Sequence, residues 1–149
     1  MIDLHVMSSD AASVFEPLKK TYAIRIFTPT WPEDMKGRLK DSDNYIRVVE
    51  YLFDDARSPG DMKLFPKMYS RLFDEDLARK MISDFGHYKP DCESMLVHCQ
   101  RGKNRSPAVA IAFNEIFQLG HDSEGLKKQY PESNWYVYGV LKKAASLKA

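Results

Sequence analysis

The residues of this sequence that could do chemistry are gathered in one stretch, from His98 to Ser106. It contains Cys99, and Arg105 follows six positions later in a C-x5-R spacing. An apolar run precedes the stretch and another opens at Pro107, so we expect a loop between a buried strand and a helix. Such a loop points backbone N–H groups at one spot, where the helix adds the positive end of its dipole. A thiol placed there ionises to a nucleophilic thiolate beside a site for anions.

The reaction that suits such a loop is transfer of a phosphoryl group to sulfur. Cys99 would attack phosphorus in line and form a thiophosphate ester, while Arg105 would offer two parallel donors to the equatorial oxygens. Gly102 permits a positive φ or a close backbone approach at the tight point of the loop. We expect the Ser106 hydroxyl to help the thiolate leave in the second step. We expect His98 to orient the loop by hydrogen bonding to the backbone and to favour the thiolate.

The pattern His-Cys-x-x-Gly-x-x-Arg-Ser resembles the signature loop of the cysteine-dependent protein tyrosine phosphatases. A lone cysteine at a strand end is usually a small core residue, and a lone arginine at a helix start is usually solvated. Four fixed residue types around one cysteine favour the catalytic interpretation. Arg105-Ser106-Pro107 and the short chain resemble the compact dual-specificity branch and its bacterial or viral relatives. The resemblance implies a two-step mechanism through a cysteinyl phosphate, with no metal and no cofactor. It also implies an aspartic general acid on a loop after an upstream strand.

Three aspartates are candidates for this acid, which protonates the leaving group and then activates water. Asp54 and Asp55 end a predicted strand, where the acid loop of the family begins. Asp61 lies farther on, in the turn-rich segment 57–67 that we interpret as an insertion. We favour Asp55, because the family's aspartate tends to close the strand and enter the loop; Asp54 is second and Asp61 third. The alternative for the Asp54-Asp55 pair is an ordinary solvated strand end.

The other loop residues are the predicted substrate-binding residues: Gln100, Arg101, Gly102, Lys103 and Asn104. Asn104 resembles the asparagine in the loop of the superfamily's RNA 5′-triphosphatases, which work without the aspartic acid. Lys103 resembles a lysine of the phosphoinositide phosphatases, and Arg101 adds further positive charge. Plain steric or solvent roles account for these three residues equally well.

Serine and proline after Arg105 replace the threonine and glycine usual in the RNA group, which favours a protein phosphatase. We therefore expect a phosphomonoester hydrolase whose partners are phosphorylated proteins, with phosphotyrosine favoured. The alternatives are an RNA 5′-triphosphatase, for which alone nucleic acid would be a partner, a phosphoinositide phosphatase, and a phospho-binding pseudophosphatase. Residues 31–43 and 57–67 show little pattern, and we expect specificity to depend on them.

Composition restricts the other classes of protein. The 149 residues are 44% hydrophobic, which suits a single phosphatase-like catalytic domain over residues 1–149. With 22 basic and 21 acidic residues, no overall field favours nucleic acid or a membrane. Membrane-spanning and signal-peptide patterns are not found, so we expect a cytoplasmic monomer that does not associate with membranes. Cys92 and Cys99 lack metal-ligand spacing; Cys92 is interpreted as a surface-loop cysteine, with a resolving thiol as the alternative.

The elements that must position the loop alternate between strand and helix. Strands are predicted at residues 2–6, 22–27, 46–53 and 94–98. Helices are predicted after Ser8, from Asp74 to Gly86, and at residues 105–119, 123–129 and 134–147. Gly86 and Gly120 are the predicted C-terminal caps of the second and third of these helices. This predicts an α/β fold with a mainly parallel central sheet of about four to five strands and helices on both faces, as in the phosphotyrosine phosphatases. The binding crevice should lie at the carboxyl ends of the strands. Asn134 is expected to cap the last helix, with a contact to the signature loop as the alternative.

Overall fold

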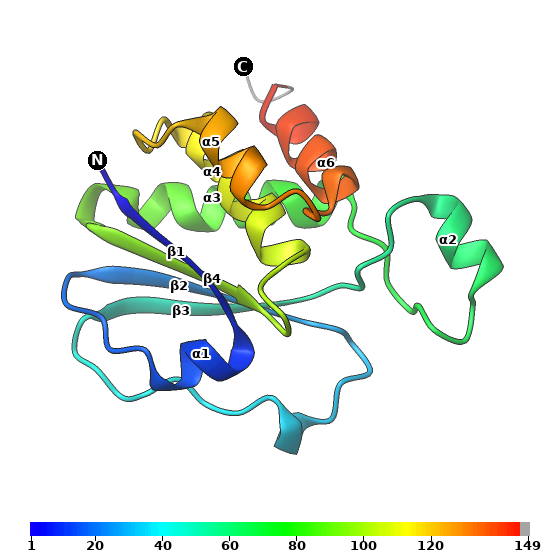
Figure 1. Ribbon diagram of the computed structural model, residues 1–149, viewed down its shortest axis with the longest axis horizontal. Coiled ribbons are helices and arrows are strands. Elements are labelled where there is room, and N and C mark those ends of the chain that lie inside the picture. Colours follow the sequence, from blue (N-terminus) through cyan, green and yellow to red (C-terminus); the bar gives the residue numbers. More distant parts are fainter. Residues whose placement is uncertain (147–149) are drawn as a thin grey trace.

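The structure, a computed structural model that describes residues 1–146, is built on a sheet of parallel strands (Figure 1). In sheet order β1-β4-β2-β3, the strands are β1 (Asp3–Ser8), β4 (Ser94–Cys99), β2 (Thr21–Phe27) and β3 (Tyr45–Leu52). All residues of β4 are buried, as expected for a strand with a neighbour on each side and helices on both faces. The predicted α/β fold is confirmed, and the described residues form a sheet of four strands.

Helices cover both faces of this sheet (Figure 1). On one face, α1 (Ser9–Val14) packs its Ala12 against Ala23 of β2 and Leu96 of β4. The other face carries the larger core and the remaining long helices, namely α3 (Glu75–Tyr88), α4 (Arg105–Phe117) and α6 (Trp135–Ser146), with α5 (Ser123–Gln129) beside α4. The first ten residues of α4 are all buried, which agrees with its nearly all-round apolar sequence.

Two helix ends differ from the sequence prediction. Gly86 does not end α3, which runs on to Tyr88 before the 3-10 turn η2 (Lys89–Asp91). Gly86 has no positive φ, so it does not form the left-handed turn that a glycine cap requires. At the end of α4 the left-handed residue is Gln118, with φ of 53°, and Gly120 follows it with φ of 100°. The predicted last position of α6, Leu147, lies outside the described residues.

The turn-rich segment after β3 contains a short helix that was not predicted, α2 (Pro59–Leu64). The Ser58 side chain accepts a hydrogen bond from the Asp61 N–H (3.2 Å), and Pro59 occupies the first helical position. None of its residues is buried, and Figure 1 shows it projecting from the rest of the molecule. In the other unpatterned segment, residues 31–43, the structure has the 3-10 turn η1 (Glu33–Met35). Among residues 1–146 no helix has the length and apolar character needed to cross a bilayer.

Candidate active site

The signature loop connects the buried end of β4 to the start of α4. Cys99 is the last residue of β4, and its Sγ lies 3.1 Å from Oγ of Ser106 in the first turn of α4. Gly102 has φ of 72°, and a Cβ there would come within 2.6 Å of the Met7 carbonyl carbon. Both the conformation and the close approach to β1 therefore require glycine at this position.

The guanidinium of Arg105 is buried and held by several acceptors. Its Nη1 donates to the Phe53 carbonyl (2.7 Å) and to Thr28 Oγ1 (3.1 Å), and its Nη2 donates to Gln100 Oε1 (3.2 Å). Phe53 directly precedes Asp54, so these bonds join the signature loop to the candidate acid segment. Thr28 was not predicted as a site residue, because only the spatial neighbourhood of β2 and β4 brings it to the loop.

A pocket of about 240 Å³ lies over Cys99 at the carboxyl ends of the strands. Its lining comes from four separate segments and comprises Thr28, Asp54, Asp55, Met68, Tyr69, Cys99, Gln100, Arg101, Asn104 and Arg105. Met68 and Tyr69 were not predicted as site residues, because nothing in the sequence indicates that the turn-rich segment folds back against the loop. The predicted position of the crevice is confirmed.

Asp54 is a buried residue that lines this pocket and also fixes the returning chain. Its Oδ2 accepts hydrogen bonds from the backbone N–H groups of Ser70 and Arg71, both at 2.7 Å. The Asp54 N–H donates in turn to the Arg71 carbonyl at 2.9 Å. One oxygen of this carboxylate is therefore committed to holding residues 70 and 71.

Asp55 lines the same pocket and is bound by Asn134. The Asn134 Nδ2 donates to Asp55 Oδ1 at 2.8 Å and to the Ala56 carbonyl at 3.2 Å. The Asn134 N–H donates to the Asn104 carbonyl at 2.9 Å, while its Oδ1 accepts from the Val137 N–H at 3.1 Å. Asn134 therefore caps α6 and contacts the signature loop, so both interpretations of this residue are confirmed.

Asp61 does not reach the pocket. Its Oδ2 accepts the backbone N–H of Arg57 at 2.8 Å, within the segment around α2. The guanidinium of Arg57 donates to the carbonyls of Glu132 (2.9 Å) and Ser133 (3.2 Å). Asp61 thus belongs to a structural contact, which leaves Asp54 and Asp55 as the aspartates beside Cys99.

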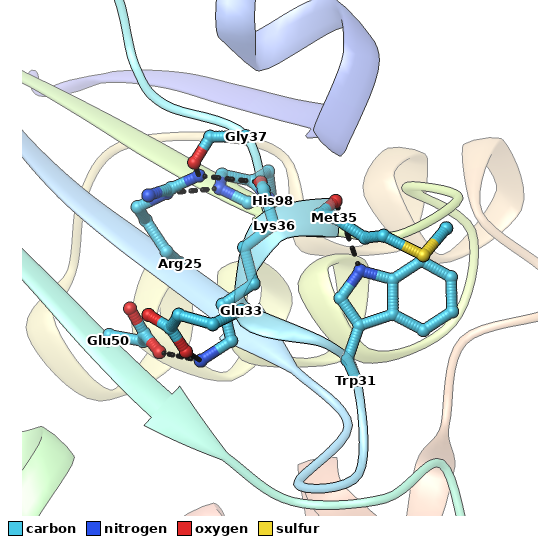
Figure 2. A network of polar contacts seen from close by, with 8 residues as sticks. All are labelled: Arg25, Trp31, Glu33, Met35, Lys36, Gly37, Glu50 and His98. Atoms are coloured by element: carbon cyan, nitrogen blue, oxygen red, sulfur yellow. Dashed lines mark hydrogen bonds and ion pairs between the residues drawn. The ribbon is translucent and has the colours of Figure 1, made fainter.

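His98 is fully buried, and its Nε2 accepts a hydrogen bond from Arg25 Nε at 3.0 Å (Figure 2). Parallel pairing places these two residues opposite each other on β4 and β2. Since the guanidinium can only donate, Nε2 is unprotonated and the neutral ring carries its proton on Nδ1. Burial and then the Arg25 charge lower the pKa of His98 to about 4. Among the described residues Nδ1 has no hydrogen-bond partner.

Arg25 is itself held by the 31–43 segment. Its Nη2 donates to the carbonyls of Lys36 (3.1 Å) and Gly37 (3.3 Å). The largely buried Lys36 side chain ion-pairs with Glu50 of β3 (2.6 Å) and with Glu33 (2.8 Å), as Figure 2 shows. A chain of polar contacts therefore runs from the edge strand to the histidine beside Cys99. Arg25 was not predicted, since an arginine in a strand carries no local sign of such a contact.

These features can be compared with known proteins. No protein-family model matches the chain, and a search of curated proteins finds no match either. Among solved structures, human DUSP28 superposes with a TM-score of 0.62 at 13% identity, over 98% of this chain and 95% of its own. A mouse putative dual specificity phosphatase, complexed with zinc tungstate, gives 0.60 at 18% identity, over 94% of this chain and 80% of its own. The chain has the fold of the dual-specificity phosphatases.

Within this dual-specificity phosphatase fold, the loop residues divide between two hollows. Gln100, Arg101 and Asn104 line the pocket over Cys99. Gly102 and Lys103 instead line a neighbouring hollow, also of about 240 Å³, together with residues 129–132. The structure thus places the Lys103 charge beside the pocket and not in its lining.

The same dual-specificity phosphatase fold separates the two cysteines. Cys92 precedes β4 and Cys99 ends it, so the extended strand puts roughly 20 Å between them at about 3.3 Å per residue. A disulfide requires Cα atoms within about 7 Å. The interpretation of Cys92 as a surface-loop cysteine is wrong, since it is buried and donates to the Ser94 carbonyl at 2.9 Å. Among the described residues no His, Cys, Asp and Glu side chains are grouped to hold a metal.

Proposed function

We propose that this protein hydrolyses phosphomonoesters through a cysteinyl-phosphate intermediate, and that its substrates are phosphorylated proteins with phosphotyrosine preferred. One observation carries the proposal: the Cys99 Sγ lies 3.1 Å from Ser106 Oγ at the start of α4, in a pocket that Arg105 also lines. A helix N-terminus and a guanidinium both favour a bound phosphate. The nucleophile and the anion-binding groups therefore share one small pocket.

In the first step, the Cys99 thiolate attacks phosphorus in line. The sulfur–phosphorus bond forms as the bond from phosphorus to the leaving oxygen breaks. Arg105 and the loop N–H groups bind the equatorial oxygens, on which negative charge is concentrated in the transition state. Asp55 is the proposed donor of the proton that the leaving oxygen takes up, and Asp54 is the alternative, because both line the pocket.

In the second step, water attacks the phosphorus of the cysteinyl phosphate. The aspartate, now ionised, takes the proton of this water, and the sulfur–phosphorus bond breaks to release inorganic phosphate. The Ser106 hydroxyl lies within hydrogen-bonding distance of Sγ and stabilises the departing thiolate. The bonds of Arg105 to Phe53, Thr28 and Gln100 keep its guanidinium oriented through both steps.

The fold supports phosphorylated proteins as the substrate class, because the similar solved structures include dual-specificity phosphatases. The mouse protein is complexed with zinc tungstate, and tungstate is a tetrahedral oxyanion like phosphate. We therefore expect tungstate to compete with substrate for the pocket over Cys99.

Among residues 1–146 no contact of the loop favours the RNA alternative. The Asn104 side chain donates to the Glu132 carbonyl at 2.7 Å, and its backbone carbonyl accepts the Asn134 N–H. These contacts within the protein account for an asparagine at this position. Lys103, the residue that resembles phosphoinositide phosphatases, lies outside the lining of the pocket.

The proposal is tested with Cys99→Ser and an activated aryl phosphate. We expect this variant to lose turnover and to keep tungstate binding, measured by calorimetry. Cys92→Ala is the matched control and should retain wild-type turnover. Turnover by Cys99→Ser would refute the assignment of Cys99 as the nucleophile. A wild-type protein that binds tungstate but has no turnover would be a pseudophosphatase. A phosphotyrosine peptide, a triphosphate-ended RNA and a phosphoinositide, compared in metal-free buffer, distinguish the substrate classes.

A further inference from the structure

The segment from residue 57 to residue 71, which we call the arm, displays large apolar side chains on its surface. Leu64 is 74% exposed, Phe65 50% and Met68 61%. Figure 1 shows that the arm, with α2 in it, projects beside the carboxyl ends of the strands. Exposed apolar side chains gathered on one segment are typical of binding surfaces, whereas scattered ones are not.

These side chains border a hollow of about 360 Å³ that adjoins the candidate active site. The hollow is lined by residues 64–68, and Met68 lines both this hollow and the pocket over Cys99. The ring of Tyr69, another residue of the pocket, meets the Phe65 ring edge-to-face at 6.4 Å between centroids. The apolar hollow and the catalytic pocket therefore share a wall.

Both ends of the arm are fastened to the body of the protein. At one end, Arg57 donates to the carbonyls of Glu132 and Ser133. At the other end, the Asp54 carboxylate accepts the N–H groups of Ser70 and Arg71. The arm is thus anchored at both ends, and Met68 joins its hollow to the pocket over Cys99.

The charge of the arm favours an anionic partner. The arm contains four basic residues, Arg57, Lys63, Lys67 and Arg71, and one acidic residue, Asp61, although the whole chain has a net charge of only +1. Positive charge beside the pocket attracts a phosphorylated partner and disfavours a basic one.

We propose that this hollow binds a bulky apolar side chain close to the phosphorylated residue of a protein substrate. The proposal rests on the proposed function, since it assigns a substrate preference to the same site. Because an extended peptide advances about 3.3 Å per residue, a side chain within roughly three residues of the phosphorylated one reaches across the shared wall. An apolar hollow that shares Met68 with the pocket over Cys99 suits an apolar side chain of a substrate held in that pocket.

The experiment compares two phosphotyrosine peptides that differ only in having leucines or serines next to the phosphotyrosine. We expect kcat/KM to be about tenfold higher for the leucine peptide, the range of a modest apolar contact. Leu64→Ser and Phe65→Ser should bring this ratio close to one and leave kcat/KM for p-nitrophenyl phosphate unchanged. Leu18→Ser is the matched control, because Leu18 is 89% exposed and lies between α1 and β2. It should leave the ratio as in the wild type.

Several results would overturn the proposal. The first is a wild-type kcat/KM that is about the same for the leucine and serine peptides. The second is a preference for the leucine peptide that both arm variants keep. The third is a loss of kcat/KM in the arm variants that is equally large with p-nitrophenyl phosphate. If the wild type sediments with anionic phospholipid vesicles and Phe65→Ser does not, the arm is a membrane-binding surface instead. Dimerisation that Leu64→Ser abolishes would assign it to a second copy of the chain. If the wild type turns over no aryl phosphate, the proposed function fails, and fluorescence anisotropy of the two peptides still decides whether the hollow discriminates between them.

Discussion

At the scale of single residues, Asp54 and Asp55 show how partners give different roles to two adjacent carboxylates. The Oδ2 of Asp54 accepts two backbone N–H groups and so holds the arm in place. Asp55 accepts one bond, from a side-chain amide of Asn134. Among the described residues each carboxylate keeps one oxygen without a hydrogen-bond partner, so the difference lies in what the other oxygen holds. Protonation of Asp54 would disturb the bonds that hold the arm, which favours Asp55 as the general acid.

We expect Asp55→Asn to slow phosphoserine-peptide hydrolysis roughly 100-fold or more, the usual range for loss of a general acid. The same variant should slow p-nitrophenyl phosphate much less, because nitrophenolate leaves without a proton. Asp54→Asn is the comparison, and we expect it to lower the melting temperature and to affect both substrates alike. Steady-state kinetics on the two substrates measures this. A loss selective for phosphoserine in Asp54→Asn would identify Asp54 as the acid instead.

Burial and then the Arg25 charge favour the neutral form of His98. Because the neutral ring is favoured in the fold, the unfolding free energy should fall as the pH drops from about 6.5 to about 4, as the unfolded histidine takes up its proton first. Arg25→Met removes the charge that is the second cause of the shift, so the pKa of His98 should rise while burial keeps it below 6.5. Nitrogen-15 NMR of the imidazole follows the tautomer and the pKa. An unchanged His98 titration in Arg25→Met would contradict this role.

At the scale of elements, the signature loop depends on contact with β1 as well as on its own sequence. Gly102 and Gly37 have nearly the same positive φ, 72° and 69°, but only Gly102 has backbone within 4 Å of where a Cβ would be. Replacing these two glycines by alanine therefore separates two effects on the free energy of unfolding. A Cβ at Gly37 meets only the unfavourable backbone conformation, whereas a Cβ at Gly102 also meets the backbone of β1.

We expect Gly37→Ala to reduce the unfolding free energy by about 1 kcal/mol, the usual cost of a left-handed alanine. Gly102→Ala should cost more and should abolish aryl phosphatase activity, because a methyl group 2.6 Å from the Met7 carbonyl carbon forces the loop away from β1. Urea denaturation and p-nitrophenyl phosphate turnover measure the two effects. Equal costs for the two variants, with activity retained, would show that the loop tolerates the displacement.

Local patterns predicted the elements best where the cause of the structure is local. The helix 123–129 was predicted with the bounds it has, and Asp74 caps α3 by accepting the Leu77 N–H at 2.9 Å, as expected. Gly86 and α2 were misjudged, because glycine, proline and serine also favour turns and only the surrounding contacts decide between the two. Cys99, Ser106 and Arg105 were predicted because one short loop contains them.

At the scale of the whole molecule, the candidate site is assembled from distant parts of the chain. Thr28 and Met68 reach it from the segments that follow β2 and β3, whose carboxyl ends lie at one edge of the parallel sheet. Asn134 reaches it from the connection between α5 and α6 and was anticipated from the sequence. The sequence pattern predicts that a crevice lies at the carboxyl ends of the strands. It does not predict which residues of the segments between the elements fold back to line that crevice. The Arg25 contact with His98 was missed for the same reason, since it depends on the pairing of β2 with β4.

The length of β4 also decides how the protein responds to oxidation. Burial raises the pKa of the Cys92 thiol, and the strand keeps it far from Cys99, so Cys92 cannot resolve an oxidised Cys99. We expect peroxide to inactivate the protein by adding oxygen to Cys99, seen by tandem mass spectrometry as gains of 16 or 32 Da on that residue, about one or two oxygen atoms on the oxidation ladder. Cys92→Ala should be inactivated at the wild-type rate and recover to the same extent with dithiothreitol. A loss of about 2 Da in the wild type, absent from Cys92→Ala, would reveal an intramolecular disulfide and require β4 to come apart.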